Sequence, residues 1–314
     1  MDNIICVVGP TASGKTRLAV ELARKYGGEV LSCDSMQIYR GMSVGTAAPT
    51  EAEMGGIPHH MIAVADPAED FSAGRYVAMA DPILRGILAR GKTAVIAGGT
   101  GLYLDSLIAG REFAPCPATG RRQELETMAD ERGMDAMLAW LATFDYEAAA
   151  RLHPSDRKRV LRACEVYLET GKTLTEHDRE TKAVPPKYSP AWIGLTFADR
   201  ADLYRRIDRR VDAMFDAGLL DEIRALLARG VAESATSLQA IGYKEPIAAL
   251  EGRATIAAAV AEIKQGTRHY AKRQLTWFRR NEKIHWISQS DPPDFPAVFA
   301  EAVRYLSEFD NDKW

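Results

Sequence analysis

The chain has 314 residues, of which 46% are hydrophobic and 26% are charged. This composition is ordinary for a globular protein, and the length allows one large core with a smaller inserted domain. No apolar run is long enough to span a membrane, and the N-terminus shows no basic leader, so neither membrane insertion nor export is expected. The formal net charge of −3 excludes nucleic-acid binding through overall charge, so such binding has to use local basic patches.

The cysteines favour a reducing compartment. Cys6, Cys33, Cys116 and Cys164 are not spaced as metal ligands, and the first two lie in apolar strand-like runs. We therefore expect a cytoplasmic protein without a zinc site.

The first hundred residues alternate apolar, strand-like runs with helical patterns. Strands are predicted at residues 3–8, 29–33 and 92–97, and helices at residues 16–26, 71–90 and 102–109. Such alternation indicates an α/β fold with a parallel sheet and helices on both faces. Continuously apolar strands are expected there, because both of their faces are buried.

The loop between the first strand and the first helix matches the phosphate-binding pattern G-x-x-x-x-G-K-[ST] in full. Its residues are Gly9, Pro10, Thr11, Ala12, Ser13, Gly14, Lys15 and Thr16. Backbone N–H groups and the positive end of the helix bind phosphate oxygens in such loops. Lys15 supplies a charge, and the Thr16 hydroxyl can bind Mg²⁺. The pattern does not say what carries the phosphates.

Two polar residues follow the next strands. Asp34 follows the strand 29–33, at the sheet edge where open α/β sheets bind ligands. Its carboxylate fits a metal ligand or general base, or an N-cap or Asx turn. Thr100 follows Gly98 and Gly99 after the strand 92–97, and it fits a helix N-cap or a substrate contact.

The second half suggests an insertion. Proline-bearing segments at residues 112–117 and 183–187 flank a helical stretch at 121–171. A strand at 191–197, helical sequence at 203–279 and a strand-like run at 283–287 follow. We expect a phosphate-loop core of residues 1–117 and 185–314, with an all-helical insertion at 118–184.

Further motifs extend along the chain. They are Asp34–Met42, Gly45–Ala47, Ile57–Met61, Gly98–Tyr103, Arg159, Arg162–Tyr167, Thr170–Lys172, Ile241–Lys244 and Lys272–Trp277. Together with the phosphate loop, they resemble the tRNA dimethylallyltransferase family over nearly the whole sequence.

The resemblance implies an enzyme that transfers a dimethylallyl group from dimethylallyl diphosphate to N6 of the adenine immediately 3′ of the anticodon. Diphosphate leaves, Mg²⁺ is the cofactor, and ATP is not cleaved. The implied partner is a tRNA anticodon stem-loop, with no membrane and no obligate protein partner, and a monomer is expected.

The same resemblance implies the catalytic residues. Asp34 is the general base, Lys15 acts with the loop on the diphosphate, and Thr100 holds the amine or the diphosphate in line. Arg206 and Arg210 lie one helical turn apart. Either one of them closes over the diphosphate, or they form surface ion pairs with the three nearby aspartates, Asp202, Asp208 and Asp212.

The implied tRNA contacts fall in two segments. The core contributes Asp34, Ser35, Met36, Gln37 and Thr100, and the insertion contributes Arg122, Lys158, Arg159, Val160, Leu161 and Arg162. The family often carries Gln in place of Lys158, so a base-specific amide contact is not expected there. Arg159 and Arg162 are spaced i, i+3, which suits either a phosphate track or a solvated helix face.

Two other groups have open interpretations. Lys264, Arg268, Lys272 and Arg279 share one face of a predicted helix, which fits an RNA-backbone contact or a solvated exterior. The pair His59–His60 lacks a third metal ligand, so a packing role in a loop is expected.

Three rival functions remain open. An isopentenyltransferase acting on free adenine nucleotides shares the loop, Asp34 and Thr100, but the basic insertion favours a polymeric acceptor. A small-molecule kinase with residues 113–184 as a lid requires ATP. A non-catalytic RNA-binding module is disfavoured by the intact Lys15, Thr16, Asp34 and Thr100.

Overall fold

The computed structural model describes residues 3–111, 113 and 119–311. The chain divides into two compact units, Met1–Ile108 with Tyr188–Trp314, and Ala109–Lys187. The sequence placed the second unit at 118–184, so the compact unit extends further at both ends. Cys116 and most of the first proline-bearing segment lie outside the described residues.

The first unit is built on a six-stranded parallel sheet with the order β3-β2-β4-β1-β5-β6. The strands are β1 (Ile4–Val8), β2 (Glu29–Cys33), β3 (His59–His60), β4 (Ala94–Gly98), β5 (Ala191–Phe197) and β6 (His285–Gln289). The predicted parallel α/β sheet is confirmed, and β1 and β2 are buried throughout, as strands covered on both faces must be. The two-residue edge strand β3 was not expected.

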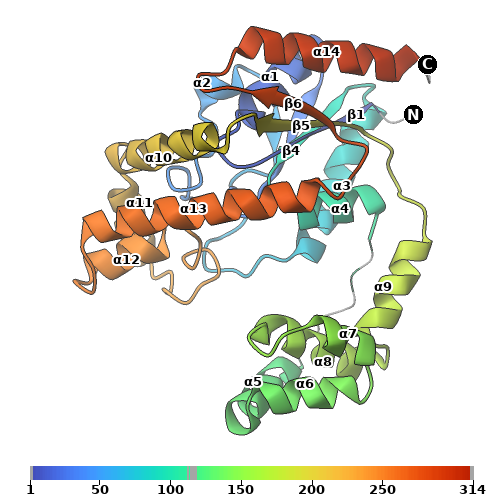
Figure 1. Ribbon diagram of the computed structural model, residues 1–314, viewed down its shortest axis with the longest axis vertical. Coiled ribbons are helices and arrows are strands. Elements are labelled where there is room, and N and C mark those ends of the chain that lie inside the picture. Colours follow the sequence, from blue (N-terminus) through green and yellow to red (C-terminus); the bar gives the residue numbers. More distant parts are fainter. Residues whose placement is uncertain (1–2, 112, 114–118, 312–314) are drawn as a thin grey trace. The chain divides into compact units, whose positions relative to one another are not determined.

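Helices cover both faces of the sheet (Figure 1). One core packs α1 (Lys15–Lys25) and α14 (Phe295–Asn311) against the strands. The core of the other face includes residues of α3 (Ala73–Ala89) and α4 (Gly101–Ala109). Sequence reasoning missed α14, although Phe295, Phe299, Ala302 and Leu306 recur at helical spacing.

The stretch expected to be helical from 203 to 279 contains four helices. They are α10 (Arg200–Asp216), α11 (Leu219–Ala228), α12 (Lys244–Leu250) and α13 (Ile256–Phe278). Gly218 breaks the first pair, because its left-handed φ of 92° ends one helix and begins the next. A further short helix, α2 (Glu51–Met54), lies between β2 and β3 and carries a capping box from Thr50.

The described residues of the second unit are helical, without a strand. Its helices are α5 (Arg121–Arg132), α6 (Met134–Ala142), α7 (Tyr146–Arg151), α8 (Arg157–Thr170) and α9 (Leu174–Ala183). Their apolar faces form one core that includes Leu125, Leu141 and Leu161. The buried carboxylate of Asp145 caps α7 and accepts two hydrogen bonds from Thr175, which fixes α9. The long helical segment expected here is therefore a set of short helices.

Among the described residues, no helix combines the length and apolar character required to cross a membrane.

Candidate active site

The phosphate-binding loop follows β1 and leads into α1. Gly9 has a φ of 139°, and a Cβ atom there would lie 2.5 Å from the backbone oxygen of Leu195 in β5. Gly14 has a φ of 91° at the start of α1. Only glycine fits the first position without moving the neighbouring strand, so the loop is held close to the sheet.

Three backbone carbonyl groups of the loop accept hydrogen bonds from side chains. Lys15 Nζ donates to Pro10 O at 2.7 Å, Arg206 Nε donates to Ala12 O at 2.9 Å, and Gln289 Nε2 donates to Ser13 O at 2.7 Å. Within the described residues, the buried Ser13 hydroxyl has no hydrogen-bond partner. A buried hydroxyl of this kind suits an incoming anionic oxygen.

A cavity of about 610 Å³ lies over the loop. Its cationic lining includes Lys15, Arg206, Arg209 and Arg210, and Asp34 is also in its wall. Charged donors and N–H groups concentrated in one hollow favour the binding of an anion.

The two arginines expected near the diphosphate do lie beside the loop. Arg210 Nη1 donates to Thr11 Oγ1 at 3.2 Å, and Arg206 bonds the Ala12 carbonyl. The alternative of surface ion pairs with Asp202, Asp208 and Asp212 is wrong for both arginines. Those aspartates pair instead with Arg205, Arg268 and Lys264, respectively.

Electrostatics at the loop favour an arriving anion. Burial, and then the positive charge of Arg210, lower the pKa of Lys15 to about 7, against the opposing effect of Asp34. Burial also lowers the pKa of Arg210. Unfavourable desolvation of two neighbouring cations is relieved when a negative group binds between them.

Asp34 occupies the turn directly after β2. Its Oδ1 accepts hydrogen bonds from Met36 N at 2.9 Å and Gln37 N at 3.3 Å, so the Asx turn weighed as an alternative role is present. Among the described residues, Oδ2 accepts no hydrogen bond. One oxygen therefore shapes the turn, and the other is available to a ligand.

Thr100 lies beside Asp34 because β4 is the neighbour of β2 in the sheet. Its Oγ1 accepts a hydrogen bond from Ser35 N at 2.9 Å and lies 3.3 Å from Ser35 Oγ. The start of α4 uses the Thr100 backbone carbonyl, so the side-chain N-cap considered as one of two roles for Thr100 is not formed. The hydroxyl instead fixes the backbone next to the Asp34 carboxylate.

A second cavity of about 320 Å³ adjoins the first. Thr11, Asp34, Thr46, Arg210 and Tyr270 line both cavities. The remaining wall of the second one is largely apolar and includes Ile207, Val211, Met214, Ile241 and Ile263. No apolar pocket was located from the sequence. These side chains come from α10, α13 and the segment before α12.

Sequence reasoning missed Gln274 as a residue of this site. The side chain is buried, and it accepts from Thr11 N at 2.8 Å while donating to Gly99 O at 3.0 Å. It thus joins the phosphate loop to the turn before Thr100. One feature of the sequence could have identified it, because Gln274 is a polar residue on the apolar face of α13, which also carries Ala271 and Phe278.

The loop that lines the second cavity is fastened by Glu222. Its carboxylate accepts from Val44 N at 2.7 Å, Gly45 N at 3.0 Å and the Tyr243 hydroxyl at 2.8 Å. A Cβ atom on Gly45 would lie 2.6 Å from the Tyr243 ring.

Gly45→Ala is expected to cost about 1–3 kcal/mol of unfolding free energy, because it overpacks this buried contact. Urea denaturation measures the change. Gly86→Ala is the matched control, because an added methyl group within α3 has open space beyond Arg90 at 3.5 Å. The control should be neutral or slightly stabilising. Equal loss in both variants contradicts the proposed packing role.

The core residues expected to contact RNA line the same region. Ser35 and Met36 lie in the wall of the second cavity. Gln37 lies in the wall of the first, where its amide bonds Ser32 Oγ and the carbonyls of Thr46 and Ala47. The Gln37 side chain therefore holds the adjacent loop in place.

The expected RNA-binding residues of the second unit have different environments. Val160 and Leu161 are fully buried in its core, so a side-chain contact with RNA is wrong for them. Lys158 and Arg159 are exposed. Two other candidates are engaged in ion pairs: Arg162 with Glu165 at 2.8 Å, and Arg122 with Glu126 at 3.0 Å.

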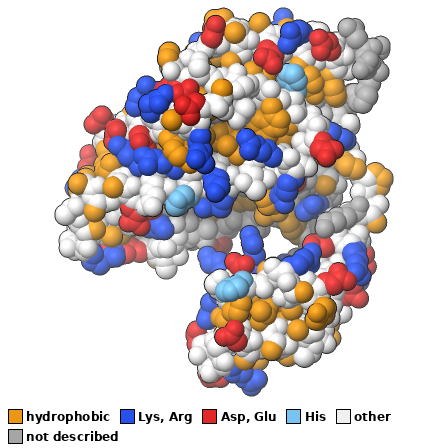
Figure 2. All heavy atoms as spheres, viewed as in Figure 1, with side chains coloured by type: hydrophobic (Ala, Val, Ile, Leu, Met, Phe, Trp, Pro, Cys, Tyr) orange, Lys and Arg blue, Asp and Glu red, His pale blue; other side chains and the backbone are white. Residues whose placement is uncertain are grey.

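Lys and Arg side chains gather over the region of α10 and α13 (Figure 2). Within it, Lys264 pairs with Asp212 at 2.5 Å and Arg268 pairs with Asp208, so these two join α13 to α10. Lys272 and Arg279 are exposed. Only part of the basic face expected from sequence is therefore available to a ligand.

The histidine pair lies in β3 instead of a loop. His60 Nε2 contacts Glu29 Oε2 at 2.7 Å, and His59 Nδ1 contacts Ile57 O at 2.8 Å. Within the described part of the chain, no group of three His, Cys, Asp or Glu side chains is arranged to hold a metal.

Fold and site together define a phosphate-loop α/β protein with a cationic cavity, an apolar cavity and a carboxylate between them. A family model described as IPP transferase matches residues 37–281, and one described as isopentenyl transferase matches residues 2–63. The tRNA dimethylallyltransferase of Geobacillus thermodenitrificans is 43% identical over 307 residues, covering 98% of this chain and 96% of its own. The chain belongs to the IPP transferase family, and it is a prenyltransferase that modifies tRNA. The resemblance inferred from the motifs is confirmed.

Two solved structures are similar over nearly the whole chain. The tRNA isopentenylpyrophosphate transferase of Bacillus halodurans has a TM-score of 0.74 at 40% identity, covering 98% of this chain and 96% of its own. A eukaryotic dimethylallyltransferase, described in crystallographic snapshots of its action on tRNA, has a TM-score of 0.81 at 28% identity. The coverage is 97% of this chain and 79% of that one.

Proposed function

We propose that this chain transfers a dimethylallyl group from dimethylallyl diphosphate to N6 of the adenine immediately 3′ of the anticodon in tRNA. The observation that carries the proposal is the place of Asp34, whose carboxylate lies in the wall shared by the cationic and the apolar cavities. This substitution needs the leaving group on one side of a general base and the acceptor on the other, and Asp34 has that position.

The diphosphate binds in the cationic cavity, held by the N–H groups of the loop, Lys15, Arg206 and Arg210. As the C1–O bond of the donor breaks, its electron pair leaves with the diphosphate, and these cations stabilise the added charge. The adenine N6 forms the new bond to C1, and the Asp34 carboxylate takes the proton that N6 loses. Thr100 fixes the backbone beside Asp34 and so keeps the carboxylate oriented toward the reacting amine.

The apolar cavity supports the same proposal. The five-carbon chain of the donor and the adenine ring have to meet in a site from which water is excluded. Ile207, Met214 and Ile263 provide apolar surface for such a site. An adenine reaches such a site only when it is flipped out of the anticodon stack. Ser35 and Met36 in the wall of the apolar cavity, and Gln37 in the wall of the cationic cavity, are proposed to contact the flipped nucleotide and its neighbours.

Mg²⁺ is the proposed cofactor. The Thr16 hydroxyl has no hydrogen-bond partner within the described residues, and it shares a cavity with Asp34. Hard oxygen ligands of this kind fit Mg²⁺, which takes one or two protein groups and completes its shell with phosphate oxygens and water. When bound, the ion adds positive charge at the departing diphosphate.

In the helical unit, the exposed Lys158 and Arg159 are the proposed contacts with the tRNA backbone. Arg122 and Arg162 are secondary candidates, because glutamates already neutralise them. We place the reaction in the cytoplasm, with no obligate protein partner.

The test of this function uses labelled dimethylallyl diphosphate, Mg²⁺ and unmodified tRNA. Label is expected in the RNA, and nuclease digestion should recover it on the adenine next to the anticodon. A parallel reaction with free AMP separates this activity from that of a nucleotide isopentenyltransferase. Label in AMP but not in tRNA would refute the proposal.

Diphosphate binding is expected to take up a proton at about pH 8, because the pKa of free Lys15 is about 7. Most of the lysine is then neutral in the free protein, and a bound anion raises its pKa and favours the ammonium form. Affinity should therefore fall as the pH rises above 7 toward the raised pKa. Calorimetry in buffers of different ionisation enthalpy counts the protons, and an uptake of zero contradicts the assignment.

A further inference from the structure

The end of β6 and the residues that follow it lie beside the phosphate-binding loop, outside the residues that either family model matches. Gln289, the last residue of β6, is 7% exposed, and the side chain of Asp291 is 4% exposed. A buried carboxylate next to the donor site calls for a physical reason, because burial of a charge is costly unless it is paired.

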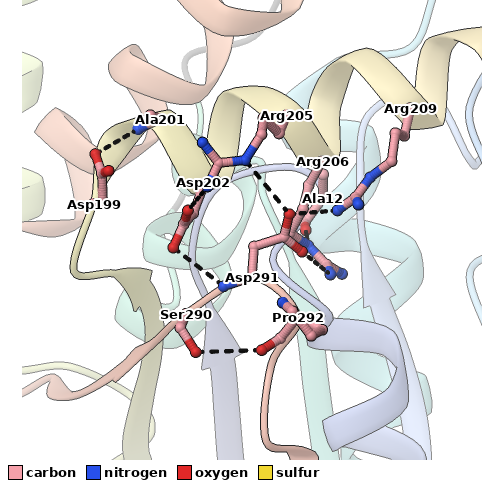
Figure 3. Close-up of polar contacts among 10 residues, drawn as sticks. All are labelled: Ala12, Asp199, Ala201, Asp202, Arg205, Arg206, Arg209, Ser290, Asp291 and Pro292. Atoms are coloured by element: carbon pink, nitrogen blue, oxygen red, sulfur yellow. Dashed lines mark hydrogen bonds and ion pairs between the residues drawn. The ribbon is translucent and has the colours of Figure 1, made fainter.

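Asp291 gathers three arginines of α10 (Figure 3). Its carboxylate lies 2.5 Å from Arg209 Nη2, 3.4 Å from Arg206 Nη1 and 4.0 Å from Arg205 Nε. Its backbone N–H donates to Asp202 Oδ2 at 3.1 Å. The segment after β6 is thus fastened to one face of α10 by both its backbone and its side chain.

One of these arginines reaches the loop. Arg206 donates from Nε to Ala12 O at 2.9 Å while its Nη1 faces Asp291. Gln289 donates to the next carbonyl, Ser13 O, at 2.7 Å. Two successive peptide groups of the loop are therefore held by side chains distant in sequence, Arg206 of α10 and Gln289 at the end of β6.

Holding these carbonyls orients the N–H groups that bind phosphate. In a planar trans peptide, the N–H of residue i+1 points opposite to the C=O of residue i. A fixed Ala12 carbonyl thus directs the Ser13 N–H away from Arg206, and a fixed Ser13 carbonyl directs the Gly14 N–H away from Gln289. Within the described residues, neither N–H has a hydrogen-bond partner.

The backbone of the loop needs such support. Ala12 has a φ of 62°, the left-handed region that a residue with a Cβ atom adopts only at a cost. Without the hydrogen bonds from Arg206 and Gln289, the peptide groups after Ala12 and Ser13 can rotate to a backbone conformation of lower energy.

We propose that Asp291 is a positioning residue for the donor, which holds Arg206 against the Ala12 carbonyl and so keeps the diphosphate-binding N–H groups of the loop facing inward. The proposal rests on the proposed function for the identity of the donor, but not for the binding of an anion. Gln289 performs the corresponding task for Ser13 by direct contact.

The test is Asp291→Asn in the full chain, which keeps the shape of the side chain and removes its charge. Calorimetric affinity for inorganic diphosphate with Mg²⁺ is expected to fall about tenfold, and kcat/KM for dimethylallyl diphosphate by a similar factor. KM for tRNA should stay unchanged. Asp291→Glu, which restores the charge, should recover part of the affinity.

Asp208→Asn is the matched control, because it also removes an aspartate–arginine pair of α10, but one that faces α13. It should leave diphosphate affinity unchanged. An equal loss in the control overturns the proposal by assigning the effect to general loosening of α10. Unchanged affinity in Asp291→Asn overturns it directly.

A double-mutant cycle with Arg206→Met separates positioning from stability. If Asp291 acts through Arg206, the second substitution adds little to the loss of diphosphate affinity caused by the first. Additive losses refute the relay. Because inorganic diphosphate binding needs no acceptor, the cycle gives its answer even if the wild-type protein transfers no label to tRNA, which would refute the proposed function alone.

Discussion

Asp34→Ala is expected to lower the transfer rate to tRNA by about 10²- to 10⁴-fold, the usual contribution of a general base, while the protein still binds dimethylallyl diphosphate. Asp34 lines both cavities, and no other carboxylate among the described residues does so. Single-turnover transfer of label measures the chemical step, and calorimetry with the donor measures binding.

The structure provides a sharper variant for the same question. Asp34 Oδ1 accepts the N–H groups of Met36 and Gln37, so alanine removes the turn together with the base. Asp34→Asn keeps an oxygen for that turn and loses only the proton acceptor. A comparably slow Asn variant supports general-base catalysis, whereas near-normal turnover in Asp34→Asn assigns the defect of the Ala variant to the lost turn.

Lys15→Ala is expected to weaken diphosphate binding and to slow transfer by about 10²- to 10³-fold, because it removes one preorganised charge at the leaving group. The lysine also donates to Pro10 O at 2.7 Å, so part of the loss comes from the shape of the loop. Steady-state kinetics with varied donor measure both effects. The proton uptake described above should disappear in this variant.

Lys25→Ala controls for the loss of one positive charge from α1, because Lys25 lies in the last turn of the helix and is absent from the walls of both cavities. It should leave donor affinity unchanged. Unchanged kinetics in Lys15→Ala contradict the proposed use of the loop.

Much of the site was predictable because its parts are local in the chain. The phosphate loop is recognisable from eight consecutive residues, because its conformation depends on glycines and a lysine that are close together in the chain. Asp34 and Thr100 were found because each follows an apolar strand. Their contact through Ser35 follows from the adjacency of β2 and β4, which the alternating pattern suggests but does not fix.

Whether a basic helical face is paired inside the protein was not predictable from the sequence. Lys264 and Arg268 fitted either an RNA-backbone contact or a solvated exterior, and the aspartates that pair with them lie on another helix, α10. Val160 and Leu161 lie between exposed Arg159 and half-buried Arg162 in sequence, yet the turn of the helix directs them into the core.

The sequence by itself determined the phosphate-binding loop pattern, the parallel α/β class and the carboxylate after the second strand, because each depends on residues that are neighbours in the chain. Only the tertiary structure decided what holds that loop. Arg206, Gln274 and Gln289 bond it from 194, 263 and 276 positions away, respectively. Such contacts depend on how helices pack on the sheet, and no local pattern in one sequence specifies which distant side chain will meet a given carbonyl.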